Sequence, residues 1–310
     1  MPGISEAFRL VWLRSLSIAL LVLVPTFWLS GCASLTTLYF HPQEVWVQTP
    51  DRFDIDYEDV WLSADDGTEL HAWLLKPAPA TEKTKVILYL HGNAENISTH
   101  SRSVFWLVEE GYTVLALDYR GFGASQGRPI LPDVLMDAKA GASWLRDAYP
   151  DHSMVVLGQS MGAALAVNFV ADYGRDYDVS QLILEAPFAG FRSVAREMLQ
   201  RTVVGTIVSP LVYLIPSDWD PKDRAPNIHI PVMQLHSPMD PIVPLSEGEV
   251  LFEALPADKR CFIASQGPHI ASFRYSKFRE QVADFLVRGE CPQVEADTVK
   301  TESVAGFTDE

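Results

Sequence analysis

Cysteine is scarce in this chain of 310 residues, where only Cys32, Cys261 and Cys291 occur. Three distant cysteines exclude a disulfide-rich scaffold, and the absence of a C-x-x-C pair excludes a zinc ribbon. The histidines and carboxylates also lack a zinc-binding spacing such as H-E-x-x-H. The sequence therefore predicts no metal site and no cofactor.

Basic residues are few as well. Lysine and arginine number 24 against 40 aspartates and glutamates, which gives a formal net charge of −16. Contacts with phosphates need a basic face, so this balance excludes nucleic acid as a partner and argues against loose electrostatic adhesion to anionic lipid. Hydrophobic residues make up 48% of the chain, as in an ordinary globular protein and unlike a disordered one.

A long apolar run lies near the N-terminus, at residues 16–29, but it is too short to cross a membrane. It has about 14 residues, whereas a spanning helix needs roughly 20, and Pro25 would interrupt such a helix. Arg9 and Arg14 precede the run and supply a short basic region. This order is typical of a signal peptide.

The four residues Leu29-Ser30-Gly31-Cys32 follow this run and resemble a bacterial lipobox. The protease needs small side chains before the cut, and the Cys32 thiol takes the diacylglyceryl group. The alternative is a plain N-terminal membrane anchor with an incidental cysteine. The resemblance implies a signal peptide at 1–31 and a lipoprotein of the cell envelope. Ala33 and Ser34 favour the outer membrane, facing the periplasm, in a Gram-negative source.

The two ends of the mature chain are predicted to lie outside the main domain. Residues 32–50 are interpreted as a tether, because prolines break them at two places. Residues 291–310 are poor in apolar side chains and predict an acidic disordered tail. An oxidising compartment permits a bridge between Cys261 and Cys291, and two free thiols are the alternative.

Residues 51–290 are predicted to form one α/β domain. Two apolar runs flank Asp65-Asp66-Gly67, which indicates a hairpin. Further on, short apolar runs alternate with helical patterns, which favours a mostly parallel central sheet with helices on both faces. The strand runs are 86–90, 113–117, 154–157, 182–184, 232–235 and 260–264, and the helical patterns are about 97–109, 132–148, 161–173, 245–254 and 271–287. Ligands bind at the carboxyl ends of such strands.

Two of these strand ends carry candidate catalytic groups. Gly158-Gln159-Ser160-Met161-Gly162 lies between a strand and a helix, where G-x-S-x-G holds a nucleophilic serine on a sharp turn. A glycine-rich packing turn is the alternative. His91-Gly92-Asn93 follows the run 86–90, so the backbone amides of Asn93 and Met161 are the candidate oxyanion hole. The Asn93 side chain alternatively only braces its loop, and His91 is interpreted as structural.

Several segments together resemble the α/β-hydrolase superfamily, in the branch of serine aminopeptidases and monoacylglycerol lipases. They cover about residues 50–290 and occur in the family order. They are Leu90–Asn93, Asp118–Ser125, Gly158–Gly162, Glu185–Phe188, His236–Pro244 and Gly267–His269. The resemblance implies an α/β-hydrolase fold and a triad in the order serine, acid, histidine.

The expected acid is Asp240 and the expected base is His269. Asp240 fits the family pattern H-G-x-x-D-x-x-V-P at His236–Pro244, although Ser237 replaces the usual glycine. Glu185 and Asp220 are rival acids, and an aspartate that only caps a turn is the plainer alternative for Asp240. His269 follows the last strand, 29 residues after Asp240. We expect Asp118, in contrast, to brace the end of its strand.

Residues 188–220 depart from the strand–helix alternation and are expected to form a short helical cap. They are apolar for a surface element, which indicates either a lid that meets acyl chains or a bilayer, or simple packing on the sheet edge. The chain is thus expected to be a serine hydrolase of the carboxylesterase or lysophospholipase type, acting on lysophospholipids, acylglycerols or small acyl esters through Ser160. An amidase or peptidase with the same triad, and a non-catalytic envelope lipoprotein, are the alternatives.

Overall fold

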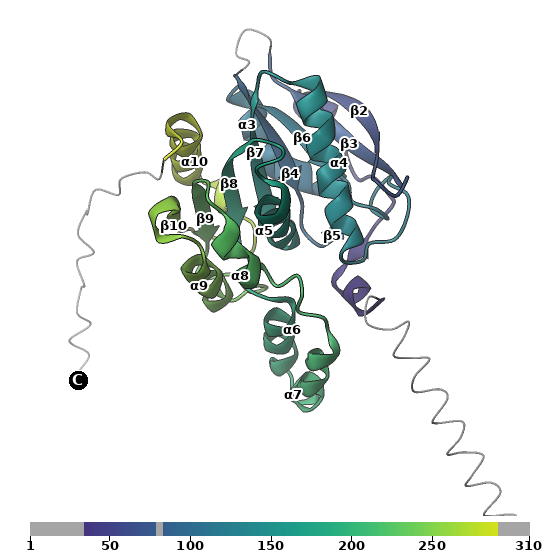
Figure 1. The fold of residues 1–310 in the computed structure, drawn as a ribbon, viewed down its shortest axis with the longest axis vertical. Coiled ribbons are helices and arrows are strands. Elements are labelled where there is room, and N and C mark those ends of the chain that lie inside the picture. The colour runs from purple at the N-terminus through teal and green to yellow at the C-terminus, as the bar shows by residue number, and fades with distance from the viewer. Residues whose placement is uncertain (1–33, 79–82, 291–310) are drawn as a thin grey trace, which may run out of the picture.

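The computed structural model describes residues 34–78 and 83–290, which form an eight-stranded sheet between two layers of helices (Figure 1). The strand order is β10-β9-β8-β7-β4-β6-β3-β2. The strands β4 and β6 to β10 run parallel, and β2 and β3 form the antiparallel edge. Their bounds are β2 Asp56–Ser63, β3 Glu69–Lys76, β4 Lys85–Leu90, β6 Thr113–Leu117, β7 Ser153–Gln159, β8 Val179–Glu185, β9 Val232–His236 and β10 Arg260–Ala264. The predicted α/β-hydrolase fold is confirmed.

Continuous apolar sequence explains why these strands lie in the middle of the molecule. β4, for example, reads Val-Ile-Leu-Tyr-Leu after its first lysine, and all five of these side chains are buried. A strand buried on both faces has to be apolar at every position. Alternate side chains of β4 therefore enter two separate cores, one on each face of the sheet.

The helices cover the sheet in two groups. α4 (Asp133–Ala148), α5 (Met161–Tyr173) and α9 (Leu245–Ala254) contribute to one core, and α3 (Phe105–Glu109) and α10 (Ser276–Arg288) contribute to the other. The short pieces α2 (Ile97–His100), η4 (Ser101–Val104), α8 (Pro221–Arg224), η6 (Ala225–Asn227), η7 (Ala257–Lys259) and η8 (Ser272–Arg274) connect them. The single helix expected at about 97–109 is thus three short pieces.

Residues beyond β8 leave the sheet and return to it before β9. They form α6 (Phe191–Gln200), α7 (Val203–Val208) and η5 (Ser209–Leu214), which project from one end of the molecule in Figure 1. The backbone N–H of Phe191 donates to the Asp220 carboxylate at 2.8 Å, so the two ends of this excursion are joined at its base. We call residues 188–220 the cap, as predicted from the sequence.

The expected tether at 32–50 is wrong for the described part, residues 34–50, because these residues pack against the domain. They contain η1 (Ser34–Tyr39) and β1 (His41–Pro42), and β1 pairs in parallel with β5 (Ala94–Glu95). The side chain of Asn96 donates to the carbonyl oxygens of Gln43 and Val45. Pro42 ends β1 and Pro50 begins η2 (Pro50–Phe53), and the segment between them still packs against the domain. η2 then leads into β2.

Several expectations fall outside the described residues. These are the signal peptide at 1–31, Cys32, the acidic tail at 291–310 and Cys291, so they stay predictions. Cys261, on β10, is disulfide-bonded. Within residues 34–78 and 83–290, the helices are too short or too polar to cross a membrane.

Candidate active site

Ser160 occupies the turn that joins β7 to α5, at the carboxyl edge of the sheet. Its backbone has φ 54° and ψ −115°, an uncommon conformation for a residue with a side chain. The turn is fixed because the Ser160 N–H donates to the carbonyl oxygen of Glu185 at 2.9 Å, while the Ser160 carbonyl accepts from Ala163 at 3.0 Å. Ser160 is largely buried, with 8% of its surface exposed.

Two glycines of the motif allow this turn to pack tightly. A Cβ atom on Gly162 would lie 2.0 Å from the carbonyl oxygen of Leu90, at the end of β4. A Cβ atom on Gly158 would lie 2.4 Å from the carbonyl oxygen of Gly162. The spacing G-x-S-x-G is therefore required by steric contact, and it brings the turn that carries Ser160 against the strand that leads to Asn93.

The structure brings Asp240 and His269 together. His269 Nδ1 lies 2.7 Å from Asp240 Oδ2, and the carboxylate is fully buried. The other oxygen, Oδ1, accepts the backbone N–H groups of Ile242 and Val243 at 2.8 and 3.0 Å. Burial raises the pKa of Asp240, but the hydrogen bond and charge of His269 and these two N–H groups outweigh burial, so the net pKa is lowered. Asp240 therefore carries the charge that orients an imidazole.

Ser237 explains the departure from the glycine usual at this point in the family pattern. Its Oγ donates to the carbonyl oxygen of Gly267 at 2.6 Å and accepts the N–H of Met239 at 3.1 Å. Gly267 has φ +91° and lies two residues before His269. The hydroxyl thus ties the turn that carries Asp240 to the loop that carries His269, which a glycine would not do.

Glu185, a rival acid from sequence, joins the serine turn to the histidine loop in another way. Its buried carboxylate accepts the N–H of Ser272 at 2.7 Å and the side-chain amide of Gln159 at 2.5 Å. Burial raises its pKa, against the opposing effect of these hydrogen bonds. Asp220, the other rival, accepts from Phe191 at the base of the cap. In the sequence, Glu185 stands directly after a predicted strand. That position alone does not distinguish a residue that positions the loops from a catalytic acid.

Ser160 makes no hydrogen bond to His269 or Asp240 among the described residues. The bond between nucleophile and base is often long before substrate binds. The two loops are nevertheless linked through Glu185, whose carbonyl holds Ser160 and whose carboxylate holds Ser272, three residues after His269. The serine turn and the histidine loop therefore share one rigid connection.

Asn93 is braced by the N-terminal segment. Its carbonyl oxygen accepts the N–H of His41 at 2.7 Å, and its side-chain amide donates to the carbonyl oxygen of Tyr39 at 3.1 Å. The side chain is therefore engaged in holding the loop. Met161 is the first residue of α5, where a backbone N–H has no partner within the helix. The backbone N–H groups of Asn93 and Met161 stay the predicted oxyanion hole.

Asp118 and His91 brace the loop that carries Asn93, as expected for structural residues. Asp118 Oδ1 accepts the N–H of Ile97 at 2.8 Å and lies 3.4 Å from His91 Nε2. The His91 ring stacks on Tyr119 with ring centres 4.5 Å apart. Both side chains are fully buried, and His91 Nδ1 lies 2.8 Å from the carbonyl oxygen of Gly92, next to Asn93.

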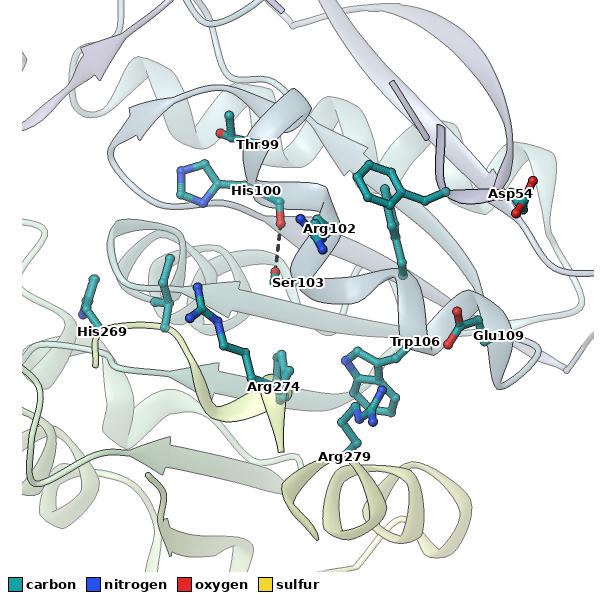
Figure 2. Close-up of a pocket in the computed structure, with 14 residues that line it drawn as sticks. Asp54, Thr99, His100, Arg102, Ser103, Trp106, Glu109, His269, Arg274 and Arg279 are labelled. Atoms are coloured by element: carbon teal, nitrogen blue, oxygen red, sulfur yellow. Dashed lines mark hydrogen bonds between the residues drawn. The ribbon is translucent and has the colours of Figure 1, made fainter. Parts of the chain in front are cut away.

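A cavity of about 800 Å³ opens beside His269 (Figure 2). Aromatic side chains of η2, α3 and η8 form part of its wall. They are Phe53, Phe105, Trp106 and Phe273. Burial and, to a smaller extent, the charge of nearby His91 lower the pKa of His100, which also lines the cavity, to about 3, so this second histidine stays neutral. The size and the mixed lining are those of a small-molecule site.

The fold, the serine turn and the Asp240–His269 pair together define an α/β hydrolase. The family described as "Serine aminopeptidase, S33" matches residues 81–216. The chain is 32% identical over 213 residues to the α/β-hydrolase domain-containing protein WAV2 of Arabidopsis thaliana, covering 66% of this chain and 68% of that protein. The chain therefore belongs to the α/β-hydrolase superfamily.

Two further comparisons bear on this chain. It is 31% identical to the lysophosphatidylserine lipase ABHD12 of Xenopus tropicalis over 189 residues, which cover 56% of this chain and 47% of that protein. The solved structure of the Pyrococcus furiosus esterase Pf2001 has a TM-score of 0.65 at 24% identity, covering 80% of this chain and 96% of that one. The latter likeness shows the shared fold.

Proposed function

We propose that this hydrolase cleaves carboxylic esters through an acyl-enzyme on Ser160. The observation that carries the proposal is the Asp240–His269 hydrogen bond, at the same sheet edge as the strained Ser160 turn. A serine hydroxyl is a weak nucleophile at neutral pH and needs a base to accept its proton. The superfamily membership supports hydrolysis, and the name of the lipase relative supports an ester as the substrate.

In the proposed reaction, His269 takes the hydroxyl proton as Ser160 Oγ attacks the ester carbonyl carbon. The backbone N–H groups of Asn93 and Met161 hold the negative oxygen of the tetrahedral intermediate. His269 then gives its proton to the leaving alcohol oxygen, and the C–O bond breaks. Water, deprotonated by His269, attacks the acyl-enzyme and releases the acid. Asp240 stabilises the imidazolium form throughout.

Amide cleavage is the second candidate, because the matching family is described by an aminopeptidase. An aminopeptidase must neutralise the free amino group of its substrate with a carboxylate that faces the site. Glu185 could have served from sequence, but its two oxygens accept from Ser272 and Gln159. Because both oxygens of Glu185 already accept hydrogen bonds, they are not available to a substrate amino group. This favours esters over peptides with a free N-terminus as substrates.

We further propose that the protein is lipid-anchored through Cys32 and that the cap faces the bilayer. Cys32 lies seven residues before Tyr39, whose hydroxyl donates to the carbonyl oxygen of Phe191, at the start of the cap, at 2.6 Å. The anchor would thus leave the domain beside the cap. The cap's α7 and η5 expose large apolar side chains, namely Val203, Val204, Ile207, Leu211, Tyr213 and Leu214.

The charge of the cap also supports an orientation in which the cap faces the bilayer. The cap, residues 188–220, contains three arginines against one glutamate and two aspartates, whereas the whole chain carries a net charge of −16. The exposed apolar side chains of the cap thus belong to a segment without the net negative charge of the rest of the molecule. Apolar side chains together with arginines suit an interface with anionic lipid. This surface, rather than the acidic remainder, would therefore contact a membrane.

The test of the proposed chemistry is hydrolysis of p-nitrophenyl esters from acetate to palmitate by the chain without residues 1–32. We expect turnover that Ser160→Ala removes, while Ser143→Ala, a change at an exposed serine, retains it. Amide analogues are measured in parallel. Turnover of amides but not of esters would favour the second candidate, and a folded protein with neither activity would overturn the proposal.

A further inference from the structure

The cavity beside His269 contains three arginines that lack a carboxylate partner. Arg102 lies on η4, Arg274 on η8 and Arg279 on α10, and all three line the cavity. Arg102 and Arg274 are exposed and Arg279 is half-buried, whereas the buried Arg120 pairs with Asp137 at 2.7 Å. Within residues 34–78 and 83–290, the three cavity arginines form neither a side-chain hydrogen bond nor an ion pair.

These arginines are distinguished by their convergence on one cavity, because other exposed arginines, such as Arg52 and Arg175, also form no ion pair within the described residues. Acidic residues outnumber basic ones by 40 to 24, so a free arginine has many possible partners on the surface. Arg102 instead places its guanidinium 4.8 Å from the centre of the Phe53 ring, in a cation–π contact that leaves its N–H donors available. Guanidinium groups bind phosphate and carboxylate through paired hydrogen bonds, which a lysine cannot match.

The two acids in the cavity lining do not cancel this charge at the reacting end. Asp54 and Glu109 lie at the end away from His269 in Figure 2, whereas Arg102 and Arg274 come between them and His269. His100, near the same end, is kept neutral because burial lowers its pKa to about 3. The part of the cavity nearest the base is therefore cationic.

The residues that line the cavity also indicate which half of an ester substrate would enter the cavity. The cavity is lined by His269 and Ile270, and also by His100, whose Nε2 lies 2.9 Å from the carbonyl oxygen of Ala94 after the Asn93 loop. In the proposed reaction His269 passes a proton to the leaving oxygen, so the alcohol half of the substrate lies nearest to His269. The carbonyl oxygen of the acyl half would instead accept the N–H groups of Asn93 and Met161.

We propose that this cavity binds an anionic group, phosphate or carboxylate, on the alcohol half of the ester substrate. This inference rests on the proposed ester hydrolysis and specifies its substrate class. Arg274 and Arg102 would hold the anion, and the aromatic wall would cover the carbon atoms that link the anion to the ester oxygen. The products are then a carboxylic acid and an anionic alcohol.

The test compares three esters that share one butyryl chain and differ only in the alcohol: glycerol, glycerol 3-phosphate and glyceric acid. We expect kcat/KM for the better of the two anionic esters to exceed that for the neutral ester by about tenfold or more. Arg274→Gln should reduce this ratio by about tenfold, since a hydrogen bond to a charged group contributes roughly this much. Arg175→Gln, a change at an exposed arginine outside the cavity, should preserve the ratio.

Inorganic phosphate serves as a second probe, and we expect it to compete with the anionic esters in the wild type and less so in Arg274→Gln. Repeating the series with palmitoyl esters in vesicles shows whether the anion is recognised on a free ester or in a lipid headgroup. A ratio near one, or a ratio that Arg274→Gln leaves unchanged, would overturn the inference while neutral-ester turnover still upheld the proposed function. Loss of all ester turnover would instead overturn both.

Discussion

His269 Nδ1 lies 2.7 Å from Asp240 Oδ2, and these residues come from loops that follow neighbouring parallel strands, β10 and β9. Parallel pairing places both strand ends at one edge, so residues 29 positions apart in sequence meet there. The bond fixes which imidazole nitrogen carries the proton and leaves Nε2 available as a base. The carboxylate is held in turn by two backbone N–H groups.

Replacing Asp240 by asparagine tests the role of its charge. Asp240→Asn retains the shape but does not stabilise the imidazolium, so we expect kcat for p-nitrophenyl butyrate to fall by about 10³-fold to 10⁴-fold. Asp258→Asn, a change at an exposed aspartate on η7, is the matched control and should retain full activity. A loss of less than tenfold in Asp240→Asn would contradict the assigned role.

Replacing Gly162 by alanine tests the packing of the serine turn. The new Cβ would lie 2.0 Å from the carbonyl oxygen of Leu90, which cannot move without disturbing β4. We expect the free energy of unfolding, measured with urea, to fall by about 3 kcal/mol or more. Gly67→Ala is the control, because Gly67 has φ +83° and open space around it, and backbone conformation alone should cost about 1 kcal/mol. Equal losses would contradict the steric account.

The pH dependence of stability should report on Asp220. Burial raises its pKa to about 6, although the N–H of Phe191 opposes this. The pKa of an unfolded aspartate is about 3.9. Because the folded value is higher, the contribution of Asp220 to stability is fully present below about pH 4 and is lost as the pH rises through 6.

Asp220→Asn removes this titration and keeps an oxygen for the Phe191 N–H. The difference in unfolding free energy, wild type minus variant, should therefore decrease between pH 4 and pH 7. Urea unfolding at several pH values measures it. The similarly raised pKa of Asp137 is present in both proteins and cancels in the difference. A difference that stays constant or grows with pH would show that burial does not raise the Asp220 pKa.

The exposed apolar side chains of the cap should determine binding to vesicles. In the chain without residues 1–32, the double change Val203→Ser and Ile207→Ser removes two side chains that are 81% and 73% exposed. We expect partition into anionic vesicles, measured by sedimentation, to fall by about tenfold. Val287→Ser, on α10 away from the cap, should leave partition unchanged. Equal partition of all three proteins would refute the bilayer-facing cap.

The sequence predicted the sheet and the positions of the chemical groups because both have local signatures. Buried parallel strands are continuously apolar, and G-x-S-x-G has a steric origin in Gly158 and Gly162. The packing of residues 34–50 was not predictable in this way. Its hydrogen bonds join backbone carbonyls to side chains such as Asn96, and such pairings leave no pattern in the sequence.

The positioning role of Glu185 also could not be predicted from the sequence. A carboxylate at a strand end could equally be the catalytic acid, and only its distance of 2.7 Å from the Ser272 N–H decides between the two. The cavity arginines Arg102, Arg274 and Arg279 come from three separate elements and have no motif in common. Their convergence is a property of the fold.

The most direct test of the central claim is covalent labelling with an alkyl fluorophosphonate, followed by intact-mass and peptide analysis. An activated serine displaces fluoride and forms one P–O bond, so only a nucleophile assisted by a base reacts rapidly. We predict one phosphonyl adduct per chain, on the peptide that contains Ser160, and none in Ser160→Ala or His269→Ala. A folded wild-type protein that stays unlabelled, or that carries its adduct on another residue, would contradict the account.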